Sequence, residues 1–495
     1  MEKNKNAKSF IDLAKRRGFF WQSSEIYGGT SGMFDYGPLG LLLKRKLINK
    51  WREFFVKQED NVYEIETSLI QPEKVFDASG HLKSFIDPVT QCKKCNSIFR
   101  ADTLIQEKTK KFVEGKEPEE LTKIIKENNI KCPKCKGELS KVKVFNLMLK
   151  TFLSPTEEEI AYLRPETAQG IFVNFKRILV ATRAKLPFGV AQVGSSFRNE
   201  ISPRQFIIRL RAFNQMEVEW FVNPKEINKH PRFKEVENIK IRILTREAQK
   251  ENGKEITLTT KEAVKKGIVP NQYLAYFLAR ETQFFQSIGL PFESIRFRHM
   301  LPEETPHYSK GNFDLEIKFD FGWKETVGNA YRTDYDLKSH MKKSGVDLTL
   351  RLDDETKIIP HIIEPSFGIE RPIYGILLYC YRDGKKRGWE WFAFPPNIAP
   401  YSAGVFPLVN KDGLQEKAKE IFKLLKKHFD VFYDDSGSIG RRYARADEIG
   451  TPFGITIDYD TMEKNTVTLR HRDTTKQDRV KIEDLVKIIY QLIHS

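Results

Sequence analysis

The stretch that decides the fold runs from Gly189 to Phe221 and reads GVAQVGSSFRNEISPRQFIIRLRAFNQMEVEWF. It consists of two runs of alternating polarity joined by a polar loop. The polar positions are Gln192, Ser196, Arg198 and Glu200 in the first run and Arg209, Arg211, Phe213, Gln215, Glu217 and Glu219 in the second. Successive side chains of a strand point to opposite faces, so the pattern predicts an antiparallel pair with one buried face.

The composition of the polar face favours a binding site. It carries three arginines, three glutamates, two glutamines and one aromatic ring, whereas a merely solvated face more often carries Lys, Thr and Ser. We interpret it as the floor of a site for a substrate with both anionic and cationic groups. The alternative is an ordinary half-exposed hairpin in a larger α+β domain, and the hairpin alone does not decide between the two.

Length and composition bound the class of protein. The chain has 495 residues, 40% hydrophobic and 12% aromatic, enough for a large core and for more than one domain. Lys and Arg outnumber Asp and Glu by 83 to 67, a formal charge of +16. This surplus favours an acidic polymer such as nucleic acid as partner, although lysine-rich segments can also be simply solvated.

No segment of the sequence indicates a membrane or a secretory pathway. The first 21 residues, MEKNKNAKSFIDLAKRRGFFW, contain no long apolar core. No run approaches the roughly 18 apolar residues of a membrane span. The sequence therefore predicts a cytoplasmic protein without membrane partners.

Four of the five cysteines form two pairs, Cys92-Lys-Lys-Cys95 and Cys132-Pro-Lys-Cys135. Each pair can place two thiolates on one tight turn, and two such turns make a tetrahedral zinc site. Four thiolates leave no open coordination position, so the predicted role of zinc is structural. Disulfides are the alternative, which a reducing cytosol disfavours. The fifth, Cys380, lies in the apolar run YGILLYCY and is predicted to be a core residue.

Three breaks divide the chain. A polar insertion with the cysteine pairs runs from about residue 88 to 145, and a second variable stretch from about 223 to 312. After residue 400 the pattern reads strand, helix, strand, helix, strand, strand and helix, which predicts a separate small α/β domain at 401–495. Residues 1–400 are predicted to form one large domain that carries both insertions.

The common glycine-rich phosphate-binding loops are absent from the sequence. There is no GxxxxGK[ST] segment and no GxGxxG segment at the end of a strand. If ATP binds, it is therefore expected to bind on strands and arginines.

Seven short motifs, in order along the chain, resemble those of glycyl-tRNA synthetases, specifically the single-polypeptide, homodimeric kind within class II. They are GGTSGMFDYGPLG (28–40), SGH (79–81), RPETAQ (164–169), FRNE (197–200), YRTDYDL (331–337), EPS (364–366) and GIER (368–371). The segments GRRYAR (440–445) and DEIGTPF (447–453) resemble the anticodon-binding domain of that family. The resemblance spans nearly the whole chain, although each motif alone would be weak.

The resemblance implies an α+β fold. It implies an antiparallel sheet of about six or seven strands flanked by helices, with a zinc-knuckle-like insertion and a C-terminal α/β anticodon-binding domain. The hairpin at 189–221 would be the second of the three sequence motifs of class II. Pro38 with the following LLLKRKLINKWREFF would be the first, at the dimer interface, and HIIEPS with ERPIYGILLY would be the third.

The implied activity is the activation of glycine with ATP, followed by transfer of glycine to the 3′ end of its tRNA. Negative charge builds on the α-phosphate and on the leaving pyrophosphate, and fixed guanidiniums and magnesium can stabilise that charge. Arg198 and Arg371 are the implied catalytic residues, with Phe213 and Arg371 stacked on opposite faces of the adenine. The implied ATP-binding set is Arg198, Asn199, Glu200, Arg209, Arg211, Phe213, Glu325, Thr326, Gly368 and Arg371, with Glu325 and Glu364 as magnesium ligands.

A glycine pocket needs paired acids for the ammonium, a base for the carboxylate and walls too close for a Cβ. The family match implies Glu166 and Glu217 at the ammonium and Arg332 at the carboxylate. The full implied glycine-binding set is Arg100, Glu166, Gln215, Glu217, Arg332, Glu364 and Ser366. Arg441, Arg442 and Arg445 would contact the tRNA. No editing domain is expected, because glycine has no smaller competitor.

Three alternatives come from other classes. A non-catalytic relative of the same fold, such as the accessory subunit of mitochondrial DNA polymerase, would be expected to lack Arg198, Glu200 or Arg371, yet all are present. A class II synthetase for threonine, serine or proline disagrees with the RPETAQ, RTDYDL and EPS segments. A zinc-dependent nucleic-acid-binding protein leaves the polar hairpin face unused. The resemblance gives His81 no chemical step, so a structural loop histidine is at least as good an interpretation.

Overall fold

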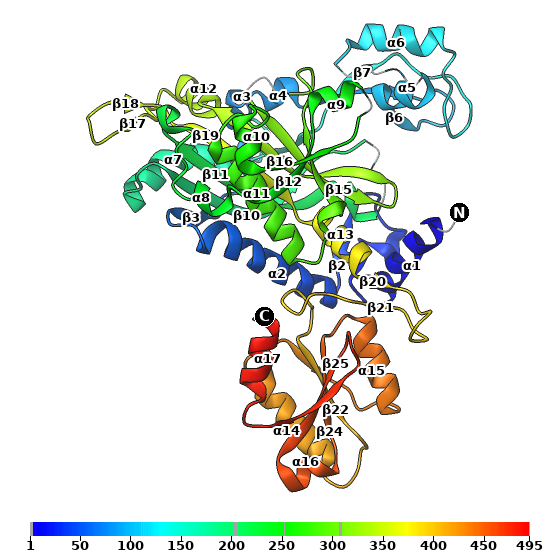
Figure 1. The fold of residues 1–495 in the computed structure, drawn as a ribbon. Coiled ribbons are helices and arrows are strands. Elements are labelled where there is room, and N and C mark those ends of the chain that lie inside the picture. Colours follow the sequence, from blue (N-terminus) through cyan, green and yellow to red (C-terminus); the bar gives the residue numbers. More distant parts are fainter. Residues whose placement is uncertain are drawn as a thin grey trace.

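The computed structural model describes residues 3–494 except 110, 112, 114, 202, 204, 205, 252 and 306–308, with side chains from residue 9 onward. A large domain carries a small projecting module and is followed by a C-terminal domain (Figure 1). Among the described helices, none combines the length and apolar character needed to cross a membrane.

A nine-stranded sheet forms the centre of the large domain. Its middle strands, in the order β14, β15, β16, β19, β11 and β10, pair antiparallel, whereas β12 joins β14 and β3 joins β10 in parallel. The strands are β3 (Val62–Ile65), β10 (Phe188–Phe197), β11 (Ala212–Val222), β12 (Lys240–Leu244), β13 (Ile256–Thr259), β14 (Ile295–His299), β15 (Asn312–Phe319), β16 (Gly322–Thr333) and β19 (His361–Gly368). The expected antiparallel sheet is present, but β3, β12 and β13 extend it at both edges and make it mixed.

The predicted hairpin is β10 and β11, which pair antiparallel with Gln192 opposite Glu217. Two details differ from the prediction. The second strand begins at Ala212 rather than near Ile208, because residues 206–208 form a short 3₁₀ helix. Part of the polar face is buried too, with Glu217 only 1% exposed, because helix α7 (Ala168–Thr182) packs across that part.

Two helices cover the apolar face of the sheet. Helix α2 (Pro38–Arg52) starts with proline at its first turn, and helix α11 (Gln272–Ser287) lies in the same core. Leu39, Leu43, Leu47 and Trp51 of α2 are all buried. Their spacing of four residues makes one apolar stripe, which fixes how α2 lies against the sheet.

The strand and helix implied for the third class motif are also present. Strand β19 runs into helix α13 (Glu370–Cys380), as expected for HIIEPS and ERPIYGILLY. Cys380 is buried in the core, as predicted. Helix α12 (Tyr335–Ser344) follows β16 and packs near α7. The remaining elements of this domain are α1 (Lys3–Arg16), β1 (Phe20–Gln22), β2 (Phe34–Tyr36), α3 (Glu73–Ala78), α4 (His81–Ser84), β4 (Ile70–Pro72), β8 (Leu149–Phe152), β9 (Ile160–Leu163), α8 (Phe233–Val236), α9 (Arg246–Lys250), α10 (Thr260–Lys265), β17 (Leu350–Arg351), β18 (Lys357–Ile358), β20 (Tyr381–Arg382) and β21 (Trp391–Phe392).

The two insertions differ in how they join the domain. The first forms the projecting module, with strands β5 (Ile86–Gln91), β6 (Ile98–Arg100) and β7 (Lys143–Asn146), helices α5 (Ala101–Thr109) and α6 (Pro118–Glu127), and a core of its own (Figure 1). The second contributes β12, β13, β14 and α11 to the central sheet and its core. It is therefore an integral part of the large domain.

The C-terminal domain has its own five-stranded sheet and core. Its elements are β22 (Ala403–Pro407), α14 (Leu414–Lys426), β23 (Val431–Tyr433), α15 (Ile439–Glu448), β24 (Phe453–Ile457), α16 (Tyr459–Lys464), β25 (Thr466–His471), β26 (Gln477–Lys481) and α17 (Leu485–His494). The sequence pattern predicted this order apart from α16 and β26, which are short.

Candidate active site

A cleft opens on the polar side of the central sheet, between β11, β16, β19 and the start of α13. Its lining consists of Arg198, Glu200, Ile207, Ile208, Arg209, Leu210, Phe213, Gln215, Glu325, Thr326, Gly328, Ser366, Gly368, Glu370 and Arg371. All the predicted ATP-binding residues except Asn199 and Arg211 are in this lining. A larger cleft between α2 and the C-terminal domain contains none of the predicted site residues.

The guanidinium of Arg198 lies between two aromatic rings. Its centre is 5.3 Å from the ring of Phe85 and 5.1 Å from that of Phe213. Its Nε donates to the carbonyl of Pro165 at 3.1 Å. The side chain is thus held in place before any ligand arrives, which is the condition for electrostatic stabilisation of a transition state.

Arg371 and Arg209 close the cleft from two other sides. Arg371, at the start of α13, donates from Nη1 to the carbonyl of Glu325 at 2.6 Å and from Nε to that of Ile208 at 3.2 Å. Arg209 pairs with Glu200, Nε to Oε2, at 2.8 Å. The cleft therefore offers three guanidiniums to one anionic ligand.

Arg211 turns away from the cleft. Its Nη1 donates to the carbonyl of Ser31 at 2.9 Å and its Nε to that of Glu200 at 3.3 Å. The backbone of Asn199 donates to Leu147 at 2.8 Å. Both residues support the loop that follows β10, outside the cleft lining.

Arg100, predicted at the glycine pocket, lies in the projecting module. Its guanidinium pairs with Asp87 at 3.1 Å and with Asp102 at 2.7 Å. Asp87 in turn feels the charges of Arg209 and Glu200. Both of these acids belong to the module, and Asp87 connects Arg100 electrostatically to the rim of the cleft.

A buried cluster of charged side chains adjoins the cleft and centres on Arg332, which is 3% exposed. Arg332 donates from Nε and Nη2 to Asp336 at 2.7 and 2.8 Å, and from Nη1 to Glu364 at 2.9 Å. The predicted carboxylate-binding arginine is therefore already paired with two acids. Asp336 escaped the sequence analysis, although it stands in the YRTDYDL motif.

Glu217 is held by three donors. Gln215 Nε2 donates to its Oε1 at 2.9 Å and Ser366 Oγ at 2.5 Å, while Thr167 Oγ1 donates to Oε2. Gln215 and Ser366 also line the cleft, so this carboxylate lies where the cleft and the buried cluster meet. Thr167 was missed, although it stands in the RPETAQ motif.

Burial controls the ionisation of these acids. It raises the pKa of Glu217, and the nearby Glu166 adds to the rise. It raises the pKa of Glu364 to about 8, even though Arg332 opposes the change. Burial acts on Glu166 in the same direction, but the charge and hydrogen bond of His81 hold its pKa below the usual range.

The cluster is short of positive charge and of hydrogen-bond donors. Its acids are Glu166, Glu217, Glu219, Glu364 and Asp336, and its bases are Arg332, His81 and the buried Arg164, whose charge interacts with Glu217. In the described part of the chain, Gln192 Oε1, Ser196 Oγ, Gln215 Oε1 and both carboxyl oxygens of Glu219 are buried without a hydrogen-bond partner. Buried polar atoms are normally satisfied, so these favour a small ligand that brings a cation and donors.

The predicted magnesium ligands lie in different surroundings. Glu325 is half exposed at the cleft, whereas Glu364 belongs to the buried cluster. Beside Glu325 the structure places two acids that the sequence analysis missed, Asp314 and Glu316 of β15. Their alternate positions in NFDLEIKF are the signal that could have found them. These oxygens suit a hard cation.

Glu370, the acid before Arg371, ties the first segment of the domain to the site. It accepts from Tyr36 Oη at 2.8 Å and from Asn214 Nδ2 at 2.7 Å. It therefore does not pair with its neighbour Arg371, which remains directed at the cleft.

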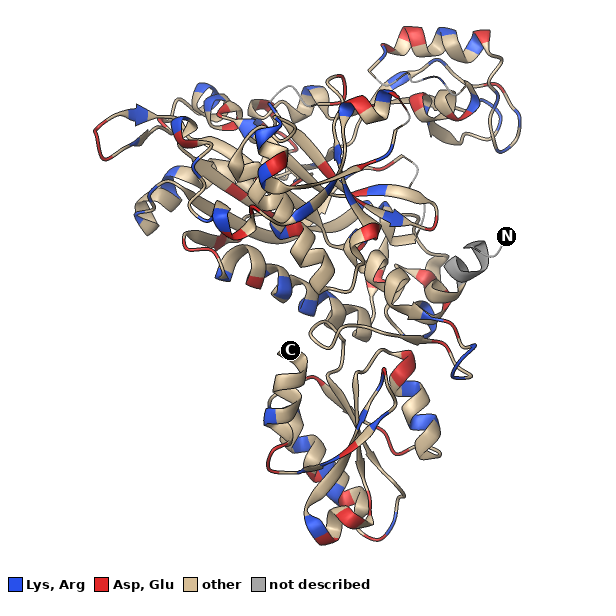
Figure 2. Cartoon of the chain, viewed as in Figure 1, with Lys and Arg blue, Asp and Glu red and all other residues tan. Residues whose placement is uncertain are grey.

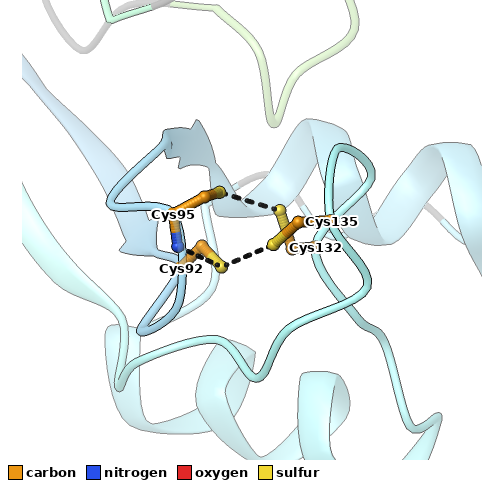
Figure 3. A group of neighbouring side chains, drawn as sticks. All are labelled: Cys92, Cys95, Cys132 and Cys135. Atoms are coloured by element: carbon orange, nitrogen blue, oxygen red, sulfur yellow. Dashed lines mark hydrogen bonds between the residues drawn. The ribbon is translucent and has the colours of Figure 1, made fainter.

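The four predicted zinc ligands come together (Figure 3). The sulfurs of Cys92 and Cys135 are 3.5 Å apart and those of Cys95 and Cys132 are 3.7 Å apart. Tetrahedral zinc–thiolate bonds of about 2.3 Å place sulfurs about 3.8 Å apart, so the group fits zinc. The two turns share one geometry, since the carbonyl of each leading cysteine accepts from the residue four positions on.

The three arginines predicted to contact tRNA lie on α15 but differ in exposure. Arg441 is exposed, whereas Arg442 is 2% exposed. Arg442 donates to the carbonyls of Asp435 and Gly437 at 2.8 and 2.7 Å and to that of Pro407. Its burial does not fit the predicted direct contact with RNA.

Lys and Arg are spread over both domains and the projecting module (Figure 2).

Arg445, the third of these arginines, is partly exposed and pairs with Asp434, Nη2 to Oδ2, at 2.6 Å. It also donates to the carbonyl of Ser436 at 2.5 Å. Arg445 therefore contacts the same loop, residues 434–437, to which Arg442 is bonded.

The comparisons with known proteins agree with this geometry. Residues 151–378 match the family model "tRNA synthetase class II core domain (G, H, P, S and T)" and residues 402–492 match "Anticodon binding domain". The fold is similar to that of prolyl-tRNA synthetase from Cryptosporidium parvum in complex with halofuginone and AMPPNP, with a TM-score of 0.58 and 13% identity over 98% of this chain and 75% of that one. Sheet, cleft and C-terminal domain thus define a class II tRNA synthetase.

Curated relatives narrow the class further. The glycine–tRNA ligase of Pyrococcus abyssi is 46% identical over 97% of both chains, and that of Pyrococcus furiosus is 45% identical over 97% of this chain and 98% of its own. The glycine–tRNA ligase of Methanothermobacter thermautotrophicus is 42% identical over 99% of both chains. The chain belongs to the glycine–tRNA ligase family.

Proposed function

We propose that this protein activates glycine with ATP and transfers it to the 3′ end of the cognate tRNA for protein synthesis. The observation that carries the proposal is the junction of an arginine-lined cleft with a buried, acid-rich cluster at Glu217. The cleft suits a nucleotide and the cluster suits an ammonium. Family membership supports glycine as the amino acid.

The first step joins glycine to ATP. One carboxylate oxygen of glycine attacks the α-phosphorus, the bond to the β-phosphate oxygen breaks, and pyrophosphate leaves. The rigid guanidinium of Arg198 is the group we assign to the α-phosphate, and Arg371 and Phe213 to the two faces of the adenine. Bound magnesium would neutralise phosphate charge, with Glu325 as the ligand at the cleft and Glu364 as the second ligand implied by resemblance.

Glycine selection follows from the crowding around Glu217. We assign Glu166 and Glu217 to the ammonium, with Gln215 and Ser366 as walls. Arg332 is paired with Asp336 and Glu364, so its main role in the proposal is to hold those acids in place. Only the edge of its guanidinium would contact the glycine carboxylate.

In the second step the terminal hydroxyl of tRNA attacks the adenylate carbonyl and AMP leaves. We assign the anticodon arm to the C-terminal domain, with the exposed Arg441 as a direct phosphate contact. In this proposal Arg442 and Arg445 shape the 434–437 loop that the RNA would meet.

Three further parts of the proposal rest on family resemblance together with local geometry. The four cysteines are assigned a structural zinc. The exposed side of α2 is assigned to the interface of a homodimer, since its other side is filled by its own core. The enzyme is placed in the cytoplasm, where charged tRNA is used.

A charging assay tests the function. Full-length protein, ATP, labelled glycine and total tRNA should give acid-precipitable glycine that alkaline hydrolysis releases, because the product is an ester. Arg441→Ala should lower the kcat/KM for tRNA several-fold and leave amino-acid activation unchanged. No esterified glycine, with tRNA that a known glycine ligase can charge, would refute the proposed function.

A further inference from the structure

His81 lies directly against Glu166, the acid assigned to the ammonium of glycine. Its Nε2 is 3.3 Å from Glu166 Oε2, and both side chains are mostly buried. The ring packs between Phe76 and Phe85, with centroids at 6.0 and 5.6 Å. The sequence left this histidine without a role, and the structure brings it to the substrate pocket.

The hydrogen bonds place a donor on the ring nitrogen that faces Glu166. Nε2 faces an ionised carboxylate, which can only accept, so Nε2 donates. The other ring nitrogen, Nδ1, is 2.7 Å from the hydroxyl of Ser79, which also lies 3.3 Å from the carbonyl of Phe76. Ser79 therefore fixes the ring so that its Nε2–H points at Glu166.

The second oxygen of Glu166 is fixed as well. Gln169 Nε2 donates to Glu166 Oε1 at 3.0 Å. The orientation of this amide is set by His340, whose Nε2 lies 2.9 Å from Gln169 Oε1. Both oxygens of Glu166 are thus held, Oε1 by Gln169 and Oε2 by His81.

We propose that His81 is a positioning residue that keeps Glu166 ionised and aimed at the ammonium of the amino acid. The proposal rests on the proposed function, because it needs an ammonium in this pocket. Without the donor on His81 Nε2, Glu166 would be a buried acid beside Glu217 and Glu364 with one donor fewer, and burial favours the protonated form of such an acid. A protonated Glu166 binds an ammonium weakly.

Two substitutions separate positioning from simple packing. His81→Phe keeps an aromatic ring against Phe76 and Phe85 but removes the donor to Glu166 and the hydrogen bond with Ser79. His81→Gln packs less well, yet its amide can still donate to Glu166. A packing role predicts that phenylalanine is the better replacement, whereas a positioning role predicts that glutamine is.

The test is steady-state ATP–pyrophosphate exchange with the full-length protein, in which KM for glycine and KM for ATP are measured separately. His81→Phe should raise the KM for glycine at least tenfold and change that for ATP less than twofold, with His81→Gln between His81→Phe and the parent. Thermal midpoints within a few degrees of the parent would show that the variants fold. Ser79→Ala, which removes only the hydrogen-bond partner of Nδ1, should shift the KM for glycine in the same direction.

Three results would overturn the proposal. One is a glycine KM within twofold of the parent for His81→Phe. Another is an equal rise in both KM values, or a larger defect in His81→Gln than in His81→Phe. If His81→Phe fails to fold, an unchanged glycine KM in Ser79→Ala and in His81→Gln would decide against it. A parent that activates no glycine refutes the proposed function itself, so the two failures are distinguishable.

Discussion

Arg332 and Asp336 form a two-pronged ion pair inside the large domain, with Nε to Oδ2 at 2.7 Å and Nη2 to Oδ1 at 2.8 Å. Arg332 stands near the end of β16 and Asp336 in the first turn of α12. The pair therefore locks the strand that carries Arg332 to the helix behind the substrate pocket. It sets the position of Glu364, which bonds to the same guanidinium at 2.9 Å.

Asp336→Asn should destabilise the large domain strongly. Arg332 keeps its bond to Glu364, but asparagine offers one acceptor where the carboxylate offers two, so at least one buried charge-assisted hydrogen bond is lost, at a cost of about 1.5–3 kcal/mol. The measurement is the urea midpoint of the unfolding transition of the large domain. Asp353→Asn is the matched control, since its pair with Lys185 is almost fully exposed, and it should leave that midpoint nearly unchanged. Equal midpoints for both variants would refute the structural role of the buried pair.

Arg198→Ala and Arg371→Ala should each reduce the rate of glycine-dependent exchange by about 10²–10³, the usual loss on removing one charge-stabilising donor. The thermal midpoint should change little, because both side chains lie at the cleft. Arg351→Ala, at an exposed hairpin, is the matched control and should keep the parental rate. Exchange within tenfold of the parent in either cleft variant would contradict the assigned roles.

Glycine binding should release protons near pH 7. In the empty pocket burial raises the pKa of Glu364 to about 8, so this carboxyl is mostly protonated at pH 7. An ammonium nearby favours the ionised form and lowers that pKa, so a proton leaves on binding and the affinity rises with pH up to about 8. Calorimetry in buffers of different ionisation enthalpy counts the protons. Glu364→Gln should release fewer, and proton uptake by the parent would show that the sign is wrong.

Purified protein should contain about one zinc per chain, and Cys132→Ser should lose it. Cys380→Ala, a change in the core away from the cysteine group, should keep the metal. Loss of zinc should also slow activation, because β5 runs from Phe85, which lies against Arg198, to the first cysteine turn. Metal analysis and protease sensitivity of residues 92–142 are the readouts. Metal-free parent protein with all four thiols reactive would contradict the assignment.

The sequence predicted those parts of the fold that follow from local patterns. The alternation of polar and apolar residues predicted β10 and β11, and the two cysteine pairs predicted the four-cysteine group. Both patterns depend on residues close in sequence. Burial could not be predicted in this way. The resemblance implied that Arg442 contacts tRNA, yet it is buried and bonded to the 434–437 loop.

Long-range pairing was equally out of reach. His81 and Glu166 are separated by 85 positions, and no local pattern in either segment predicts their contact. The same holds for Arg332 and Glu364, which meet only because β16 and β19 are neighbours in the sheet. The motifs named these residues, and the structure was needed to say which of them line the cleft and which pair with their neighbours.

The central claim is that the acid-rich pocket beside the arginine cleft selects glycine. Amino-acid-dependent ATP–pyrophosphate exchange, run with the full-length protein across all standard amino acids, tests it most directly. Glycine alone should support exchange, and Glu217→Gln should raise its KM sharply while the KM for ATP stays near the parental value. Alanine or serine activated as well as glycine, or no exchange with any amino acid, would contradict the account.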